Sequence, residues 1–363
     1  MRIGVDAREL TGRPTGVGRY LAGLLAEWST ADSARRHDFV LYSAQPLAVE
    51  LDTRKFVPRV VDGAGGTWWE QMTLPPAAHA DHLDVWFAPG YTSPLRLRIP
   101  TVVTVHDISF VVHPEWFTMR EGARRRWVCR HSAETARAIV AVSTFTKNEM
   151  VEWLNLPAGK IHVIPSRIVP ASKRSAATRE RPNEPRVLYV GSIFNRRRVV
   201  DLIRAFAPIA RTHSNASLDI VGDDRTFPRE NLRGAIAAEG VGAQVRWHKY
   251  VDDARLQVLY ANARAFAFLS EYEGFGLTPL EALAAGVPAL LADTPVAHES
   301  CGDAALYVPV GDLRAATQAL ERLLFDDSIR ARLLQAAPAV LRRFDASRAA
   351  AATLAVIEAA ADT

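Results

Sequence analysis

The chain has 363 residues, which exceeds the usual size of a single hydrophobic core and predicts two domains. Its composition is that of a globular protein, with 48% hydrophobic and 23% charged residues and no apolar run approaching a membrane span. The net charge of +4 is too small to indicate a nucleic-acid partner, and two distant cysteines without metal-ligand neighbours argue against a disulfide framework or a zinc site. The first residues read as a strand rather than as the apolar core of a signal peptide, so we expect a cytoplasmic protein.

Short apolar runs alternate with helix-length segments along the chain, which is typical of parallel sheets covered by helices. In the first half we predict strands at Arg2–Val5, Phe39–Tyr42, Val85–Ala88, Thr101–Val105, Ala138–Val142 and Ile161–Ile164. The polar, proline-rich stretch from Pro165 to Pro185 lacks periodicity and is predicted to be a linker. A second series is predicted at Val187–Val190, Leu218–Val221, Val245–His248, Ala265–Leu269, Ala289–Leu291 and Leu306–Val308. Two open α/β sheets in series would bind ligands in a cleft at the carboxyl ends of their strands.

A glycine-bearing loop, Gly12 to Tyr20, follows the first predicted strand. A dinucleotide fingerprint would need a third small residue where Leu21 stands, so the loop gives only weak support for NAD. An ordinary turn and a loop that brings Gly16 and Gly18 to a ligand both remain open.

Two further segments of the first half carry candidate residues. Trp68 and Trp69 precede Glu70, where core packing and an aromatic wall for a sugar ring are both compatible with the pattern. His106 and Asp107 directly follow a predicted strand, so we expect them at the mouth of the cleft.

A run of basic residues, REGARRRWVCR from Arg120 to Arg130, lies in a segment predicted to be helical. Such a run is usually a solvated helix face. Beside Trp116, Phe117 and Trp127 it would also suit an anionic bilayer, to which each basic charge contributes about 1 kcal/mol. Membrane contact is therefore a hypothesis.

Three consecutive arginines, Arg196 to Arg198, follow the first strand of the second series and Gly191. They could form a solvated surface run. Arginine also clamps phosphate oxygens through two parallel hydrogen bonds and stays charged in any environment, which favours a phosphate site.

The stretch SEYEGFGLTPLEALAAGVP, Ser270 to Pro288, places two carboxylates, Glu273 and Glu281, eight positions apart across a glycine-bearing turn. A helix is predicted to start there, with Thr278 as N-cap, Pro279 at the first helical position and Glu281 completing a capping box. A strand, a glycine turn and a helix N-terminus in this order present backbone N–H groups and a positive dipole end, which suits a diphosphate.

The string EGFGLTPLEALAAGVP resembles, nearly residue for residue, the signature of family-4 retaining glycosyltransferases. The WEQ stretch, the His-Asp pair and the arginine run resemble further landmarks of that family. The resemblance implies the α/β GT-B fold, in which two Rossmann-like, doubly wound domains face each other across a cleft. It places an acceptor-side domain at 1–165, a linker at 166–185, a donor-binding domain at 186–345 and a terminal helix at 346–363 that crosses back to the first domain.

The resemblance also implies roles for individual residues. Glu273 would face the donor sugar, Glu281 would bind the ribose, and His106 would contact the sugar. Arg196 and Arg197 would hold the diphosphate, although Arg197 stands where the family usually carries lysine. The predicted catalytic residues are thus Glu273, His106 and Arg196; the further donor-binding residues are Gly16, Gly18, Gly191, Arg197, Gly274, Phe275, Gly276, Leu277, Thr278 and Glu281; and the acceptor-side residues are Trp69, Glu70, Tyr91 and Asp107.

The function implied is transfer of a hexose, of mannose or rhamnose type, from a nucleoside-diphosphate sugar, with GDP favoured, to a glycan or lipid-linked acceptor in surface polysaccharide synthesis. No metal or other cofactor and no nucleic acid is expected, and the enzyme would act in the cytoplasm or at the inner face of the membrane. A sugar-nucleotide hydrolase or epimerase on the same fold, and a catalytically silent carbohydrate-binding subunit, are the alternatives.

Overall fold

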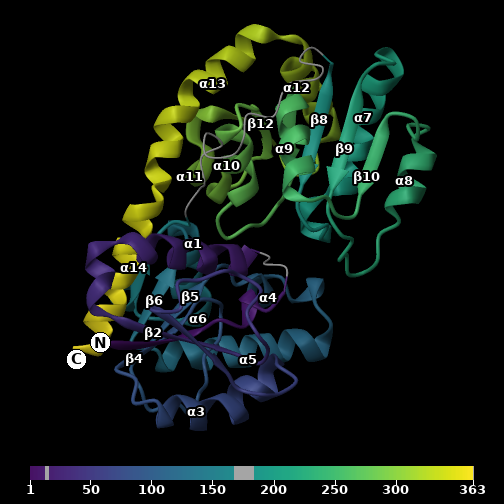
Figure 1. The fold of residues 1–363 in the computed structure, drawn as a ribbon. Helices are drawn as coiled ribbons and strands as arrows, with labels where there is room; N and C mark the ends of the chain where they lie inside the picture. Colours follow the sequence, from purple (N-terminus) through teal and green to yellow (C-terminus); the bar gives the residue numbers. More distant parts are fainter. Residues whose placement is uncertain (13–15, 167–183, 363) are drawn as a thin grey trace. The chain divides into compact units, whose positions relative to one another are not determined.

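The structure is a computed structural model that describes residues 1–12, 16–166 and 184–362 (Figure 1). Arg13 to Thr15 of the glycine loop and residues 167–183 of the predicted linker lie outside the described residues. The chain divides into two compact units. Unit 1 comprises the described residues of Met1–Pro114, Met119–Arg167 and Phe344–Thr363, and unit 2 comprises those of Glu115–Thr118 and Ile168–Arg343.

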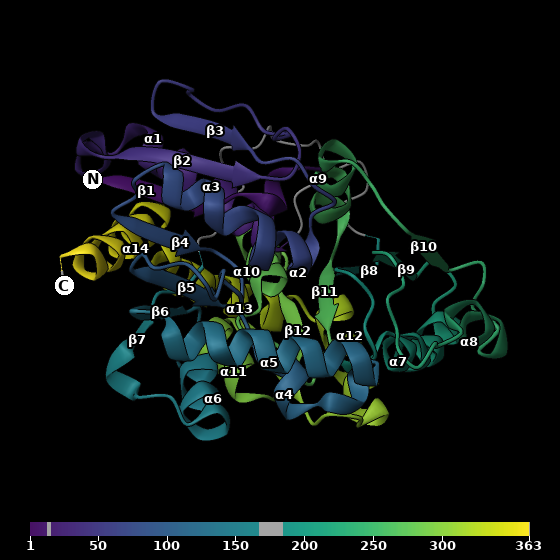
Figure 2. The same ribbon diagram turned by 90° about the horizontal axis from the view of Figure 1, so that it is seen from below.

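Unit 1 is built on a parallel sheet of seven strands in the order β3-β2-β1-β4-β5-β6-β7, which Figure 2 shows from top to bottom. From β1 the chain adds β2 and β3 on one side, and it then adds β4 to β7 on the other side. The direction of strand addition therefore reverses between β1 and β4, and ligands of such sheets bind at this switch point. The strands are β1 (Arg2–Asp6), β2 (Asp38–Ser43), β3 (Phe56–Val60), β4 (Val85–Ala88), β5 (Thr101–Val105), β6 (Ala138–Ala141) and β7 (Ile161–Val163).

Helices cover both faces of this sheet, with α1 and α14 on one face and α3 and α5 on the other (Figure 1). The α-helices of unit 1 are α1 (Gly16–Thr30), α2 (Gly66–Trp68), α3 (Leu74–Ala80), α4 (Ser109–Val112), α5 (Met119–Thr135), α6 (Thr144–Leu154) and α14 (Ala346–Ala361). Short turns of other helix types lie at Arg8–Leu10, Asp32–Arg36, Trp69–Thr73 and Ala158–Lys160.

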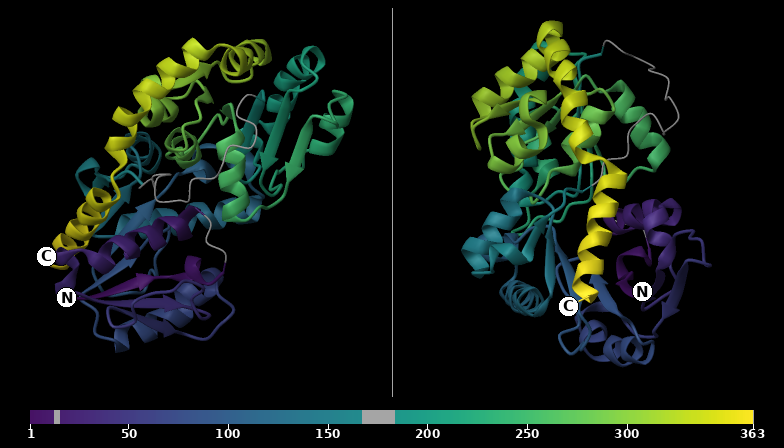
Figure 3. Two further views of the ribbon diagram at one scale, coloured as in Figure 1. Left: turned by 45° about the horizontal axis from the view of Figure 1, so that its top comes forward. Right: turned by 90° about the vertical axis from the view of Figure 1, so that its left-hand side faces the viewer.

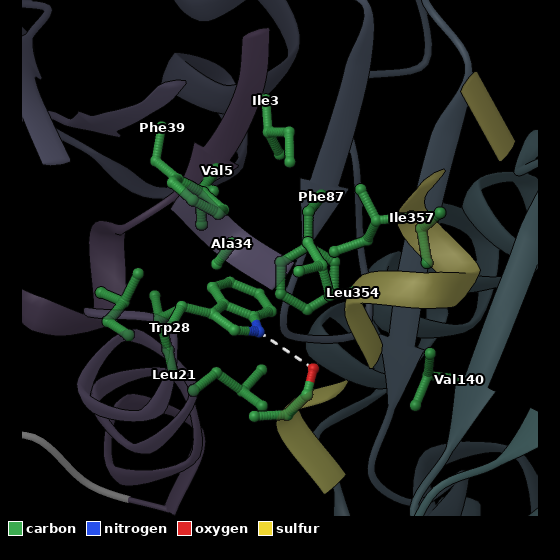
Figure 4. Close-up of a cluster of buried hydrophobic side chains, with 14 of the residues drawn as sticks. Ile3, Val5, Leu21, Trp28, Ala34, Phe39, Phe87, Val140, Leu354 and Ile357 are labelled. Atoms are coloured by element: carbon green, nitrogen blue, oxygen red, sulfur yellow. Dashed lines mark hydrogen bonds between the residues drawn. The ribbon is translucent and has the colours of Figure 1, made fainter. Parts of the chain in front are cut away.

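The C-terminal helix α14 forms part of the core of unit 1. It lies beside α1, with both chain ends at the same end of the unit (Figure 3). Leu354 and Ile357 are fully buried in a cluster around Trp28, whose indole N–H donates to the Ala350 carbonyl oxygen at 2.9 Å (Figure 4). The last turns of the chain therefore complete the hydrophobic core formed by its first residues.

Unit 2 is built on a parallel sheet of six strands in the order β10-β9-β8-β11-β12-β13, with its switch point between β8 and β11. The strands are β8 (Arg186–Val190), β9 (Ser217–Val221), β10 (Val245–His248), β11 (Ala265–Phe268), β12 (Ala289–Ala292) and β13 (Ala305–Val308). The α-helices are α7 (Val199–Thr212), α8 (Leu232–Ala238), α9 (Asp253–Asn262), α10 (Leu277–Ala284), α11 (Pro295–Cys301), α12 (Leu313–Phe325) and α13 (Asp327–Leu341).

The strands predicted from the sequence are confirmed to within one residue at either end. The prediction missed β3, an edge strand that contains Pro58 and is exposed beyond its first residue. Edge strands need no apolar alternation and tolerate proline, so the pattern that identifies buried strands is absent there.

Candidate functional site

Two turns meet at the switch point of unit 2. The arginine turn, Gly191–Arg198, follows β8, and the glutamate turn, Ser270–Gly276, follows the neighbouring strand β11. The Glu271 N–H donates to the Arg196 carbonyl oxygen at 2.9 Å, so the backbones of the two turns are directly joined. The topology thus brings together the two motifs that the sequence predicts as a phosphate site.

Glycine is required where the arginine turn leaves the sheet. Gly222, which follows the adjacent strand β9, has no room for a side chain, because a Cβ atom there would lie 1.9 Å from the Gly191 carbonyl oxygen. A Cβ atom on Gly191 would lie 2.6 Å from Nη1 of Arg197. Gly222 therefore lets the two backbones lie close together, and Gly191 leaves room for the Arg197 side chain to fold back over the turn.

The three arginines of the turn have different partners. Arg198, in a left-handed conformation, donates from Nε to Asp201 at 2.8 Å and from Nη1 to Glu271 at 2.9 Å. Arg197 donates from Nε and Nη2 to the two carboxylate oxygens of Glu273 at 2.8 and 3.3 Å, and from Nη1 to the Ser192 carbonyl oxygen at 2.8 Å.

Arg196 differs from both neighbours. Within the described part of the chain it makes no ion pair with a carboxylate, and its Nε atom is buried without a hydrogen-bond partner. Its guanidinium lies over the ring of Phe194, 4.4 Å from the centroid, and 5.9 Å from that of Trp116. Of the three arginines, Arg196 is the one whose charge no carboxylate neutralises.

Glu273 is held as a carboxylate. Ser270 Oγ donates to its Oε1 at 2.9 Å, in addition to the two bonds from Arg197. Burial raises the pKa of Glu273. The charges of Arg197 and Arg196 and the hydrogen bonds lower it by more than burial raises it, so the pKa lies below its usual value. Burial lowers the pKa of Arg197, which Glu273 and Tyr189 more than offset, so the net pKa of Arg197 is raised. Glu273 is therefore ion-paired with Arg197, and Arg196 adds a positive charge that has no ion-pair partner among the described residues.

Helix α10 begins earlier than the sequence predicts, and the predicted capping box is wrong. The N-cap is Gly276, in a left-handed conformation with φ +92°, and no side chain caps the helix. A chain that turns through a left-handed glycine enters the helix before Thr278 is reached, so Thr278 lies inside the first turn instead of capping it. The positive end of the α10 dipole consequently lies directly after the glutamate turn.

In unit 1, His106 and Asp107 follow β5 beside Tyr91, which follows β4. His106 Nε2 bonds to the Pro89 carbonyl oxygen at 2.7 Å, and because a carbonyl only accepts, Nε2 carries the proton. Burial lowers the pKa of His106, and the bond to Pro89 only partly reverses this, so the net pKa is lowered. The ring is therefore neutral at pH 7, with Nδ1 as a hydrogen-bond acceptor.

Tyr91 and Asp107 are linked to each other. The Tyr91 hydroxyl donates to Asp107 Oδ2 at 2.9 Å, while Asp107 Oδ1 accepts from the N–H and the hydroxyl of Ser109 at 2.8 and 2.6 Å. Tyr91 has φ +61°, an unusual backbone conformation for an aromatic residue, and its ring centroid lies 5.5 Å from that of His106. These contacts fix the surroundings of His106.

The structure corrects the prediction that Trp69 and Glu70 face an acceptor. Trp69 is only 1% exposed and donates from its indole to the Val61 carbonyl oxygen at 2.7 Å. The buried carboxylate of Glu70 pairs with Arg8 at 2.7 Å and accepts from the Thr92 hydroxyl at 2.7 Å. One turn of helix carries the two side chains into the interior, so neither offers a free surface to a ligand.

Sequence reasoning missed Arg8, whose guanidinium bridges Glu70 and Asp6 just after β1. The signal was an Asp-x-Arg sequence at the carboxyl end of a predicted strand. Gly16 and Gly18 lie in the first turn of α1, and at Gly90 a Cβ atom would come within 2.8 Å of Val17 in the same turn. The start of α1 therefore packs against the loop that precedes Tyr91.

Among the residues that the structure describes, no three His, Cys, Asp or Glu side chains come together as a metal-binding group. In the same residues no helix has the length and apolar character needed to span a bilayer.

Comparison with known families decides the identity. The model of the group 1 glycosyl transferases matches residues 172–340, and that of Glycosyltransferase Family 4 matches residues 14–171. The chain belongs to the family-4, group 1 glycosyltransferases. The resemblance read from the sequence is thereby confirmed.

Relatives of this family-4 glycosyltransferase include two curated O-antigen enzymes. O-antigen chain mannosyltransferase B of Escherichia coli is 27% identical over 262 residues, which cover 68% of this chain and 66% of the relative. O-antigen chain mannosyltransferase RfbU of Salmonella typhimurium is 27% identical over 233 residues, which cover 64% of this chain and 63% of the relative. The chain thus spans just under two thirds of the length of these relatives.

Solved structures show the fold of this glycosyltransferase. The Anabaena HepE protein in complex with UDP and glucose superposes with a TM-score of 0.76 at 17% identity, covering 99% of this chain and 100% of that one. WaaG, a glycosyltransferase involved in lipopolysaccharide biosynthesis, gives a TM-score of 0.77 at 17% identity, covering 98% and 99%. The expected α/β GT-B fold is confirmed.

Proposed function

We propose that the chain is a retaining hexosyltransferase that binds a nucleoside-diphosphate sugar in unit 2 and transfers the sugar to a hydroxyl acceptor. One observation carries the proposal. At the switch point of unit 2, the guanidinium of Arg196, which makes no ion pair among the described residues, lies near the ionised Glu273. Helix α10 begins directly after this glutamate turn. A nucleoside-diphosphate sugar carries the matching groups, a dianionic diphosphate next to a sugar that develops positive charge.

The charges of the site fit the two halves of the reaction. The bond between the anomeric carbon and the diphosphate oxygen breaks, leaving positive charge on the sugar and negative charge on the diphosphate. Arg196 and the α10 N-terminus would stabilise the departing diphosphate, and Glu273 would oppose the positive charge on the sugar. The acceptor oxygen would bond to the anomeric carbon on the same face, with its proton passing to the leaving phosphate oxygen. In this proposal the enzyme needs no metal, and chelation by EDTA should leave the rate unchanged.

His106 would act on the sugar as a neutral group. Since its Nε2 proton is directed to Pro89, Nδ1 would accept a hydrogen bond from a sugar hydroxyl rather than supply positive charge. Tyr91 would keep the His106 ring in place by packing against it, and Asp107 would fix Tyr91 by accepting a hydrogen bond from its hydroxyl.

The identity of the sugar rests on the relatives. Those compared above are named mannosyltransferases of O-antigen synthesis, and another, from Komagataeibacter xylinus, is named as a GDP-mannose-dependent enzyme acting on a polyprenol-linked acceptor. These names favour a mannose- or rhamnose-type donor carried by GDP and a glycan or lipid-linked acceptor in surface polysaccharide synthesis. Sugar selection rests on a few contacts of about 1–3 kcal/mol each, so the donor must be measured.

A helix face of unit 1 supports the membrane hypothesis. Arg120, Arg124 and Trp127 recur at helical spacing along α5, all exposed, and Met119 at the start of the helix is 91% exposed. Arg124 donates to the Thr67 hydroxyl at 2.7 Å, next to Trp68, which is 75% exposed. We include in the proposal that this face contacts an anionic bilayer, where it would meet a lipid-linked acceptor at the inner face of the membrane.

Trp116 and Phe117, which the sequence placed beside this basic run, do not belong to the face. Both residues fall in unit 2, and Trp116 packs against Tyr272 there.

Co-sedimentation with vesicles containing phosphatidylserine tests the hypothesis that this face of α5 contacts a membrane. Binding should weaken with salt and with the double change of Arg120 and Arg124 to Glu, and absence of binding at low salt would contradict it.

The decisive experiment for the donor is thermal stabilisation by UDP, GDP, ADP and dTDP, with and without their common sugars. A ligand that binds only the folded protein at one hundred times its Kd stabilises it by about 2.7 kcal/mol. We expect a shift with one base, reduced in Arg196→Ala, and turnover lost in Glu273→Gln. A sugar-nucleotide hydrolase or epimerase would release or isomerise the sugar without an acceptor, and a silent subunit would bind without turnover.

A further inference from the structure

Trp116 belongs to a four-residue segment that departs from its surroundings in the chain. Glu115–Thr118 groups with unit 2, whereas α4 before it and α5 after it belong to unit 1. Nothing in the sequence pattern sets Trp116 apart from the other tryptophans, and it is not one of the residues that the family signature singles out. Its contacts indicate what it does.

Trp116 contacts both turns of the candidate site. The Arg196 guanidinium carbon lies 5.9 Å from the centroid of its ring, within the range of a cation–π interaction. Its ring also meets that of Tyr272 edge-on, with centroids 5.9 Å apart and an angle of 69° between the planes. Tyr272 is buried and directly precedes Glu273. Trp116 therefore packs beside the arginine that lacks a carboxylate and the glutamate turn at once.

The rings around Arg196 supply what the neighbouring arginines obtain from carboxylates. Arg197 and Arg198 are oriented by ion pairs with Glu273 and with Asp201 and Glu271. Arg197 also lies over rings, 5.5 Å from the Phe194 centroid and 5.2 Å from that of Phe268. Arg196 has rings alone, those of Phe194 and Trp116, and no ion pair among the described residues. An aromatic face attracts a guanidinium without using its N–H groups or neutralising its charge. Rings thus hold the side chain while leaving its hydrogen-bonding capacity to an anion.

We propose that Trp116 is a positioning residue for the donor diphosphate. It holds the Arg196 guanidinium against Phe194, with its own ring packed edge-on against Tyr272, so that the N–H groups of Arg196 meet diphosphate oxygens. The inference rests on the proposed function of the same site, and it adds a residue from the segment between α4 and α5 to the machinery of unit 2.

A double-mutant cycle tests the inference, with GDP and UDP as probes and the dissociation constant of the tighter one as readout. Trp116→Ala should weaken binding about tenfold, which corresponds to about 1.4 kcal/mol, and Trp116→Phe should recover most of the loss. In an Arg196→Ala background, Trp116→Ala should cause no further loss, because its effect passes through the guanidinium. Trp153→Ala, a change of an exposed tryptophan remote in sequence from both turns, is the matched control and should bind as the wild type does.

The outcomes separate the two levels of the proposal. If the wild type binds, Arg196→Ala weakens binding and Trp116→Ala does not, the positioning role is wrong and the donor site stands. Equal losses from Trp116→Ala in both backgrounds would also overturn it, since the tryptophan would then act on the fold alone. If the folded wild type binds neither nucleotide, the proposed function fails and the inference fails with it. Trp116→Leu keeps apolar bulk but has no aromatic face for the guanidinium, so it should weaken binding as Trp116→Ala does and keeps the test decisive if Trp116→Ala does not fold.

Discussion

Arg197 and Glu273, 76 positions apart in the chain, form a two-point ion pair in which Nε and Nη2 each donate to one carboxylate oxygen. The side chains are 15% and 16% exposed. The family usually carries lysine at the position of Arg197, and lysine is a point charge that cannot make this parallel pair of bonds. In this chain the residue that replaces the lysine orients the glutamate.

Removing the guanidinium should therefore cost both turnover and stability. We expect Arg197→Met to lower kcat/KM at least about 100-fold and to destabilise unit 2 by about 2–3 kcal/mol, less than for a fully buried pair because both side chains retain some solvent contact. Arg197→Lys keeps the charge and should retain most of the stability while losing part of the rate. Steady-state kinetics and urea denaturation measure the two effects, and a full rate in Arg197→Met would show that Glu273 needs no such partner.

The lowered pKa of Glu273 predicts a pH dependence of stability. Burial raises this pKa, but the two arginines lower it by a larger amount, so the pKa in the folded state lies below the unfolded value of about 4.3. The carboxylate therefore stabilises the folded state above the unfolded pKa, and this contribution is lost as the pH falls through the folded pKa. The difference in free energy of unfolding between wild type and Glu273→Gln should be constant from pH 6 to 8 and shrink toward pH 3. A difference that grows on acidification would mean that the pKa is raised instead.

His106 should give the rate an acidic limb. Its pKa is lowered by burial, so the ring is neutral at pH 7 and gains a proton only below the usual value of about 6.5. Protonation would remove the acceptor at Nδ1, so kcat/KM should fall at a pH below the usual histidine pKa, and this limb should be absent in His106→Asn, which keeps an acceptor without titrating. The same protonation should reduce the stability of unit 1, because the unfolded chain binds the proton more readily. An acidic limb that persists unchanged in His106→Asn would remove His106 from the reaction.

The contribution of α14 to unit 1 can be measured with one substitution. Leu354 is fully buried beside Trp28, so Leu354→Ala should cost about 2–5 kcal/mol of stability through lost contacts and the cavity left behind. Ala355→Ser, one position along on the exposed side of the helix, should change stability by less than about 0.5 kcal/mol. Equilibrium urea denaturation compares the two. Similar small effects would mean that the last helix is dispensable for the core.

Part of the candidate site was predictable because it depends on local sequence. Strands such as Val85–Ala88 and Thr101–Val105 are short runs of apolar or β-branched residues whose bounds the structure reproduces. Residues that directly follow a strand, such as His106 and Gly191, could be assigned to the carboxyl edge of a sheet, because in a parallel sheet all strands end at the same edge. Glycine and proline near the start of α10 likewise marked a turn into a helix.

Other features depended on packing and escaped the sequence. Thr278 has the type of an N-cap residue, but Gly276 adopts the left-handed conformation and starts the helix before it. Trp68 and Trp69 are chemically identical, and only the helical turn of the chain decides that Trp69 is buried and Trp68 exposed. Glu70 reads as a surface carboxylate until Arg8 and Thr92 are seen to bind it.

The sequence by itself determined that two parallel sheets follow one another and that an arginine run and Glu273 stand at strand ends. Periodicity and turn chemistry act over a few residues, so they are legible in one dimension. Only the tertiary structure decided which partner each of the three arginines has. Arg198 pairs with Glu271, Arg197 pairs with Glu273, and Arg196 packs against the rings of Phe194 and Trp116. Charge pairing depends on distances of a few ångströms between segments far apart in the chain, and those distances exist only once the sheet has brought β8 and β11 together.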